Sequence, residues 1–177
     1  MTKYAEEPFP EIELVPAEPE QEPILANLLE LYIHDFSEFH SCEIGDNGRF
    51  GYSRLAQYWN EPDRSAFLIK TKGKIAGLVF VARGPGVLVN HPVWDIAEFF
   101  ILRGYRRRGF GTNVAHEVWK ILPGHWEIRV MQSNVPAQRF WVHAISTFMG
   151  EAANPARVDR GGVWWQIFSF DTRAKAG

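Results

Sequence analysis

The sequence predicts a mixed α/β fold in which a mostly antiparallel sheet is flanked by helices. Three observations predict it. Short apolar runs rich in Val, Ile and Phe recur along the chain and are typical of buried strands. Longer segments carry apolar residues at three- and four-residue spacings, which is the pattern of amphipathic helices. One strand-like run leads directly into a turn rich in arginine and glycine and then into such a helix.

The first half of the chain predicts a helix followed by a β-hairpin. An apolar stripe begins after Pro23, a residue that suits the first turn of a helix, and continues to Phe36. Two β-prone runs flank a short turn that contains Gly73, which is the pattern of a hairpin. The expected elements are a strand at 11–16, a helix at 23–36, a loop at 41–49, a short helix at 53–59, strands at 66–70 and 75–82, and a loop at 84–86.

The second half predicts further strands, each of the first two followed by a helix. Pro123 and Gly124 end the first of these helices, and Asn134 stands where it can cap the second. The expected elements are a strand at 93–102, a helix at 112–122, a strand at 126–131, a helix from Asn134 to 145, a loop at 151–160 and a strand at 163–170. Residues 1–10 and 171–177 are expected to be loose termini.

Composition bounds the class of protein. With 177 residues, the chain suits a single domain over 1–177 with a sizeable core. Its net charge of −2 gives no overall field that would attract nucleic acid, so no nucleic-acid partner is expected. The single cysteine, Cys42, excludes an internal disulfide framework and suits a reducing compartment. Neither a secretory leader nor an apolar run of the roughly 20 residues that a membrane span needs is visible. We therefore expect a cytoplasmic protein, with no membrane partner and no metal site.

The turn between the strand at 93–102 and the next helix predicts a phosphate-binding site. Four arginines lie within six positions, and Gly109 and Gly111 close the turn. The first amides of a helix have no intrahelical partner and attract anions, glycine lets the backbone approach closely, and arginine adds forked donors. A Walker loop does not fit because no Lys-Ser or Lys-Thr follows, and a dinucleotide fingerprint does not fit because Val114 stands at its last position.

The pattern that does fit is R-x-x-G-x-G, formed by Arg106, Gly109 and Gly111. With Glu98 in the preceding strand and Tyr105 before the arginines, this segment resembles the acetyl-CoA pyrophosphate loop of the GNAT N-acetyltransferase superfamily. The resemblance implies a GNAT-like fold whose fourth and fifth strands, at 93–102 and 126–131, part near Leu102 and Met131 to admit the pantetheine arm. The residues that it assigns to the pyrophosphate, by side chain or amide, are Arg106, Arg107, Arg108, Gly109, Phe110, Gly111 and Thr112.

The same resemblance assigns two further parts of the cofactor site. Backbone N–H groups around Ile101 and Leu102, where a bulge splays the strand in the family, would polarise the thioester carbonyl. Asn134, Ala137 and Phe140 match the family's N-x-x-A-x-x-F spacing, which implies that Asn134 contacts the pantetheine or phosphate arm. A plain helix cap is the competing interpretation of Asn134, and both roles are compatible.

The sequence departs from the family at the next position. Many members carry a tyrosine that protonates the departing thiolate, and this chain has Trp141, whose indole N–H cannot give up a proton near neutral pH. Three alternatives stay open: another group such as Ser133 or a nearby tyrosine substitutes, a water substitutes, or the thiolate leaves unassisted. A structural role is favoured for His143, which lies on another face of the same helix.

Two carboxylates are candidates for the general base that the acceptor ammonium requires. Glu98 is the first because an unpaired charge within a central strand would be costly to bury, and Asp95 is the alternative. A structural ion pair with an arginine is the competing role for Glu98. On the acceptor side of the cleft, the resemblance points to the region after the first helix, whose aromatic residues are Phe39, Phe50, Tyr52, Tyr58 and Trp59.

These observations predict an enzyme that transfers an acetyl group from acetyl-CoA to a primary amine of a small molecule or peptide by direct attack. The first alternative is a non-catalytic acyl-CoA-binding or sensing module, which the missing tyrosine favours. The second is a nucleic-acid-binding domain that uses the arginine turn on phosphodiesters, against which the overall charge argues. The identity of the amine, the preferred acyl chain and the oligomeric state, including a homodimer, are left open by the sequence.

Overall fold

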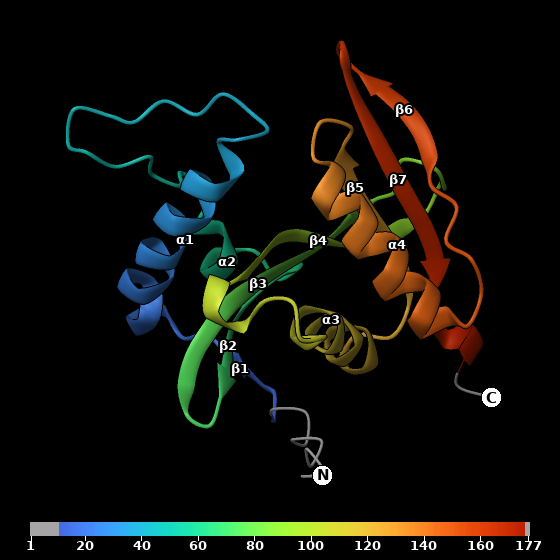
Figure 1. Cartoon of the computed structure of the whole chain (residues 1–177), viewed down its shortest axis with the longest axis horizontal. Helices are drawn as coiled ribbons and strands as arrows, with labels where there is room; N and C mark the ends of the chain where they lie inside the picture. Colours follow the sequence, from blue (N-terminus) through green and yellow to red (C-terminus); the bar gives the residue numbers. More distant parts are fainter. Residues whose placement is uncertain (1–10, 176–177) are drawn as a thin grey trace, which may run out of the picture.

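The computed structural model describes residues 11–175 and has one seven-stranded sheet with helices on both faces (Figure 1). The strands are β1 Glu13–Pro16, β2 Arg64–Thr71, β3 Lys74–Pro85, β4 Pro92–Ile101, β5 His125–Met131, β6 Ala156–Arg160 and β7 Val163–Asp171. The α-helices are α1 Glu22–Phe36, α2 Gln57–Asn60, α3 Phe110–Ile121 and α4 Val135–Met149, and short 3-10 turns are η1 Pro19–Gln21, η2 Arg103–Tyr105 and η3 Thr172–Lys175. The strand order is β1-β2-β3-β4-β5-β7-β6.

The two faces of the sheet bury two separate apolar clusters, because side chains alternate along each strand. Ile69 and Val79 point to the cluster that also contains α3 and α4. Leu68 and Phe80, one residue away on the same strands, point to the cluster that contains α1 and α2. Strands β2 and β3 are therefore buried on both faces, which explains their nearly continuous apolar sequence.

The sheet opens between β4 and β5, as predicted. All neighbouring strands are antiparallel except this parallel pair, which is joined only at Trp94 and Trp126. The strands already separate after this pair, earlier than expected, and near Ile101 and Met131 their facing edges line cavities instead of pairing. In Figure 1, α1 and the loop after it stand on one side of this opening, and α4 with β5 to β7 on the other.

The β-bulge lies at Ala97, so its expected place around Ile101 and Leu102 is wrong. Phe80 pairs with Glu98, but the next residue, Val81, pairs with Ile96, which leaves Ala97 as the extra residue. A bulge shifts the alternation of side chains by one position. Ile96 therefore joins the cluster under α3 and α4, whereas Glu98 lies on the face that carries α1 and the loop after it.

The expected elements of the first half are present, with two differences in extent. Strand β3 continues over the first two residues of the predicted loop at 84–86, because Gly84 and Pro85 pair with Val93 and Pro92. Pro85 is tolerated there because it stands at the very end of the strand. The short helix predicted at 53–59 is reduced to Gln57–Asn60, preceded by turns. The strand at β1, the helix α1 and the β2–β3 hairpin agree with the prediction.

The predicted loop at 151–160 is wrong over its second half, which forms β6. Gly161 and Gly162 connect β6 to β7 with φ of +67° and +85°. A two-residue turn with both φ positive fits the twist of an antiparallel hairpin, and glycine adopts it without steric cost. The hairpin adds β6 as the outer strand of the sheet.

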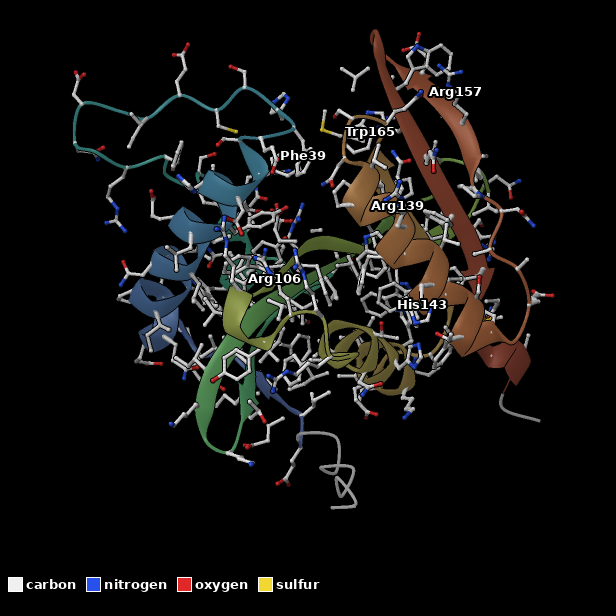
Figure 2. The ribbon with its side chains drawn as sticks, in the orientation of Figure 1. Phe39, Arg106, Arg139, His143, Arg157 and Trp165 are labelled. Carbon is white, nitrogen blue, oxygen red and sulfur yellow. The ribbon has the colours of Figure 1, made fainter. Side chains whose placement is uncertain are left out.

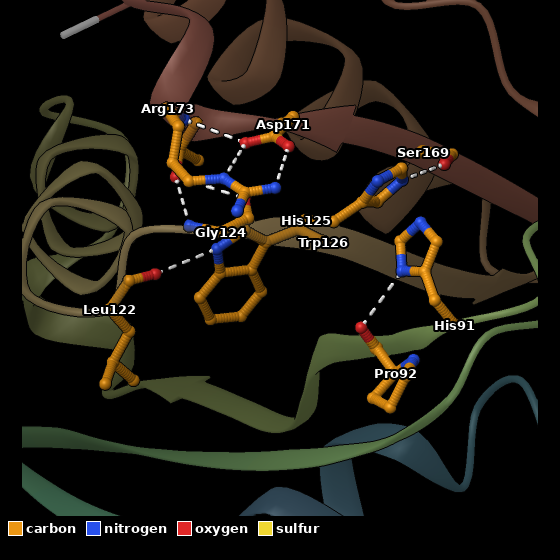
Figure 3. Close-up of polar contacts among 10 residues, drawn as sticks. His91, Pro92, Leu122, Gly124, His125, Trp126, Ser169, Asp171 and Arg173 are labelled. Carbon is orange, nitrogen blue, oxygen red and sulfur yellow. Dashed lines mark hydrogen bonds and ion pairs between the residues drawn. The ribbon is translucent and has the colours of Figure 1, made fainter.

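The C-terminal segment is ordered through Lys175, so the prediction of a loose terminus from 171 is wrong over 171–175. Asp171 ends β7 and accepts two hydrogen bonds from the Arg173 side chain (Figure 3). Thr172 is buried, and its hydroxyl accepts from the N–H of Gly124, directly before β5. The segments 1–10 and 176–177, for which loose ends are also predicted, lie outside the described residues. Within residues 11–175, no helix is both long and apolar enough to span a bilayer, and no cluster of three or more His, Cys, Asp or Glu side chains is suited to a metal ion.

Candidate active site

The arginine-glycine turn exposes the N-terminus of α3 to a cavity. Arg107 and Gly109 both adopt left-handed φ, +69° and +72°, which turns the chain sharply after η2. The N–H of Asn113 is the first to bond within the helix, to the carbonyl of Gly109 at 3.0 Å. The amides of the first three helical residues, Phe110 to Thr112, therefore have no intrahelical acceptor, as is general for a helix start. Such an end attracts an anion.

The four arginines of the turn divide into two structural roles. Arg103 and Arg106 each place a guanidinium nitrogen 2.6 Å from a carboxylate oxygen of Asp35 on α1. Arg106 also donates from Nε to the carbonyl of Ile101 at 2.6 Å. Burial opposes ionisation of Asp35, but the hydrogen bonds from the two arginines outweigh it and lower its pKa. Arg107 lines the cavity at the helix start, and Arg108 is exposed beside it without lining that cavity.

Phe110 and Gly111 build the turn from the protein side. Phe110 is buried and packs against Tyr105, with ring centroids 5.7 Å apart, so only its backbone faces the helix end. A Cβ on Gly111 would lie 3.2 Å from the ring of Phe140 on α4. Gly111 thus allows α3 and α4 to approach closely beside the cavity.

The first cavity has a volume of about 630 Å³ and extends from the α3 helix end to the edge of β4. Of the predicted cofactor-binding residues, those that line it are Ile101, Arg106, Arg107, Gly109, Gly111, Thr112 and Asn134. Leu102, Arg108 and Phe110 do not line it. Its wall combines arginine side chains and helix amides with the apolar side chains of Phe99, Ala137 and Phe140. These surfaces fit a molecule with a phosphate group and a less polar arm.

The edge of β4 in this cavity presents the amide of Ile101. The N–H of Leu102 donates to the carbonyl of Ala76 on β3 at 2.8 Å, so the prediction of Leu102 as a polarising amide is wrong. Successive amides of a strand point to opposite edges. The N–H groups of Ile101 and Phe99 therefore point away from β3, toward the opening between β4 and β5. Phe99, which the sequence analysis did not single out, lines both cavities of the opening.

Asn134 caps α4 and lies in the opening as well. Its side-chain oxygen accepts from the N–H of Ala137 at 3.1 Å, which confirms the predicted cap. Asn134 and Ala137 line both cavities. The cap fixes the orientation of this side chain, and its amide nitrogen stays available as a donor.

A second cavity, of about 620 Å³, contains Glu98. The carboxylate of Glu98 accepts from the hydroxyl of Tyr52 at 2.7 Å, and a guanidinium nitrogen of Arg54 lies 3.8 Å away. Burial raises the pKa of Glu98, against the effect of hydrogen bonds from Tyr52 and Tyr32. A carboxylate with a raised pKa, next to a cavity, has the properties of a general base.

Asp95, the alternative base, does not line either cavity. It is buried in β4 and paired with Arg129 of β5. Burial raises the pKa of Asp95, and the hydrogen bond from Arg129 works in the opposite direction. The pair joins the two parting strands, a structural role that separates Asp95 from the site around Glu98.

The two cavities share a wall that contains Trp141. Its ring is buried and packs against Phe99 at 5.2 Å and Phe140 at 4.7 Å between centroids. Ser133, one predicted substitute for the missing tyrosine, lines neither cavity and donates to the carbonyl of Phe39. Tyr32 of α1 lines both cavities, and its hydroxyl helps to lower the pKa of Glu98.

The aromatic residues predicted near the acceptor divide between the site and the core. Phe39 lines the first cavity, and Phe50 and Tyr52 line the second. Tyr58 packs on Phe80 at 4.3 Å, and Trp59 packs in the same core cluster. The sequence analysis missed Tyr32, Asp35 and Arg54. The first two are three residues apart in α1 and so lie on one face of that helix, which was the available signal.

Comparison with known proteins gives one family. Residues 25–144 match the Acetyltransferase (GNAT) family. An acetyltransferase from Thermus thermophilus is similar in structure, with 18% identity, a TM-score of 0.65 and coverage of 90% of this chain and 96% of that one. Aminoglycoside acetyltransferase AAC(6')-Ib in complex with coenzyme A has 13% identity and a TM-score of 0.69, and the match covers 94% of this chain and 98% of that one. Arabidopsis thaliana NAA60 in complex with acetyl-CoA has 15% identity and a TM-score of 0.59, and the match covers 92% of this chain and 99% of that one. Among curated proteins, none matches the sequence significantly.

The fold and this match define the class of protein, that of the acyl-CoA-dependent acetyltransferases. The chain belongs to the GNAT acetyltransferase family, since the matched region exceeds half of its length. Membership confirms the resemblance that was predicted from the arginine-glycine turn. The predicted mixed sheet, open between β4 and β5, is confirmed by the strand pairing, and acetyl-CoA as the expected cofactor is confirmed by the family.

Proposed function

We propose that this protein transfers an acetyl group from acetyl-CoA to a primary amine of a small molecule or peptide, with Glu98 as the general base. The observation that carries the proposal is the meeting of two cavities at Phe99 and Trp141, one reaching the α3 helix end and the other holding Glu98. Donor and acceptor would occupy one cavity each, and their reacting ends would meet at the shared wall.

The chain's own groups then have distinct tasks. Arg107 and the amides at the start of α3 would hold the diphosphate, and Asn134 would contact the pantetheine arm. Acetyl-CoA supplies the acetyl group as a thioester, whose carbon–sulfur bond breaks as the amide bond forms. The amide of Ile101 would donate to the carbonyl oxygen as negative charge develops on it. Glu98 would take the proton that the acceptor ammonium must lose.

Tyr32 is the group best placed to return a proton to the thiolate. It borders both cavities, and burial and the nearby Glu98 raise its pKa, so it stays protonated until the thiolate forms; Glu98, which takes the proton of the amine, could then pass a proton back to it. A thiol such as that of cysteine has a pKa of about 8.5. The thiolate of CoA can therefore leave without a proton donor, although more slowly.

The test is release of free thiol from acetyl-CoA with a panel of primary amines, compared between the wild type and Glu98→Gln. We expect amine-dependent release, a fall in kcat of at least about a hundredfold in the variant at neutral pH, and a CoA dissociation constant within about twofold of the wild type. An unaltered rate in Glu98→Gln would mean that another group is the general base.

The second candidate function is a non-catalytic acyl-CoA-binding module. Trp141 favours it, because the position where the family commonly has a proton donor holds a buried indole. The same assay separates the two functions: tight CoA binding without thiol release on any amine would support the module and reject the enzyme.

A further inference from the structure

The second cavity has aromatic side chains on two opposite sides. Phe36, Phe50 and Tyr52 come from α1 and the loop after it, Trp141 and Trp165 come from α4 and β7, and Phe99 lies between them on β4. These two groups of elements flank the opening of the sheet (Figure 1). A flat apolar group that enters this cavity can therefore contact aromatic rings on both sides, an arrangement that stabilises stacked or edge-to-face packing.

Trp165 is positioned for such a contact by the alternation of β7. Its neighbour Trp164 lies on the other face of the strand, 42% exposed, with the guanidinium of Arg157 4.1 Å from its ring centroid. Trp165 is half-buried and lines the second cavity. Figure 2 shows Trp165 on the side of β7 that faces Phe39, and Arg157 on the other side.

The charges of the cavity are largely used within the protein. Arg129 pairs with Asp95, and Arg54 lies 3.8 Å from Glu98. Glu43 is the other carboxylate of the lining. A polyamine or an aminoglycoside carries several ammonium groups and would need several carboxylates to replace their hydration. Glu43 is exposed to solvent and Glu98 is buried, so one ammonium group beside Glu98 is what the buried part of the lining can neutralise.

We propose that the acceptor is a small primary monoamine joined by a short linker to an aromatic ring. The inference rests on the proposed function, since it names the acceptor class of the same site. The amine would lie near Glu98, and the ring would pack against the aromatic lining of the same cavity, which includes Trp165.

The experiment compares acceptors that differ by one feature, using the full chain and saturating acetyl-CoA. The probes are 2-phenylethylamine, ethylamine as the same amine without the ring, spermidine and kanamycin as polycations, and a short peptide with a free N-terminus. We expect kcat/KM for 2-phenylethylamine to exceed that of each other probe by at least tenfold, or about 1.4 kcal/mol. A preference for either polycation or for the peptide, or equal rates with ethylamine, would overturn the proposal while leaving the enzyme intact. Failure of every amine with intact CoA binding would overturn the proposed function, and this inference with it.

A pair of adjacent tryptophans provides a matched control. Trp165→Ala should raise KM for 2-phenylethylamine at least fivefold, change KM for ethylamine less than twofold and leave the calorimetric affinity for CoA unchanged. Trp164→Ala removes the same side chain from the other face of β7 and should leave all three quantities unchanged. Direct binding of 2-phenylethylamine to the CoA-loaded protein, measured by calorimetry, should weaken in Trp165→Ala alone. Equal effects of the two substitutions would contradict the placement of the ring.

Discussion

The hydroxyl of Tyr52 donates a hydrogen bond of 2.7 Å to the carboxylate of Glu98 and so connects the loop after α1 to the central strand β4. The bulge at Ala97 makes this contact possible, because it places Glu98 on the α1 face of the sheet. Burial disfavours the ionised carboxylate, whereas the hydrogen bond favours it. Tyr52 therefore helps to set the pH range in which Glu98 can accept a proton.

The first prediction is that Tyr52→Phe shifts the acidic limb of the kcat/KM–pH profile to higher pH. Burial already raises the pKa of Glu98, and loss of a hydrogen bond that lowers it raises it further. A base acts only when ionised, so activity at pH 6 should fall about threefold or more while the plateau at high pH is retained. Tyr105→Phe, on the cofactor side, is the control and should leave the profile in place. An unshifted limb would show that Tyr52 does not control this ionisation.

The elements that the sequence predicted are those that local patterns specify. The apolar runs of β2, β3, β4 and β7 and the stripe of α1 carry their own periodicity. Strand β6 was missed because its five residues have little apolar content, although Gly161 and Gly162 before a strand were a signal for a hairpin turn.

The site could be predicted only as far as its motif reached. The helix start at Gly109 to Thr112 follows from residues adjacent in the chain. The bulge at Ala97 depends on how β3 and β4 pair, and the contact of Asp35 with Arg103 joins residues 68 positions apart. Long-range contacts of this kind leave no periodic trace in one sequence, so Tyr32, Tyr52 and Arg54 could not be assigned to Glu98 in advance.

The second prediction concerns the two arginines whose roles the structure separates. From the sequence alone, Arg108→Glu is expected to weaken CoA binding at least tenfold. In the structure Arg107 lines the cavity at the α3 helix end and Arg108 does not, so the larger loss is now expected for Arg107. Arg107→Gln should raise the CoA dissociation constant about tenfold, roughly 1.4 kcal/mol, and Arg108→Gln less than threefold. Calorimetry at two salt concentrations measures both dissociation constants. A larger loss of affinity in Arg108→Gln than in Arg107→Gln would mean that Arg108 binds the phosphate.

The third prediction is that Asp35→Asn loosens the turn before α3. Asp35 binds both Arg103 and Arg106, and Arg106 in turn holds the carbonyl of Ile101. The variant should have a lower Tm at pH 7 and a several-fold weaker affinity for CoA. The arginines lower the pKa of Asp35 in the folded protein, so its stabilising effect is full above the ordinary aspartate pKa of about 3.9 and is lost as the pH falls through the lowered pKa.

Thermal unfolding across pH checks this assignment. The Tm difference between wild type and Asp35→Asn should be constant near neutral pH and shrink in acid. Glu13→Gln removes an exposed carboxylate of β1 that forms neither ion pair and serves as the control. A difference that persists unchanged in acid would mean that the side chain acts by packing and not through its charge.

The last prediction addresses the proton donor that Trp141 cannot provide. Tyr32 borders both cavities and interacts electrostatically with Glu98, so Tyr32→Phe should lower kcat about tenfold or more without changing the CoA dissociation constant beyond twofold. Adding Trp141→Tyr to that variant places a phenol where the family commonly has one, and it should restore part of kcat. The smaller ring leaves space beside Phe99 and Phe140, so some loss of Tm is expected with this second change. A kcat that is unchanged in Tyr32→Phe would instead mean that the thiolate leaves with a proton from water or with none, and then Trp141→Tyr should bring no gain.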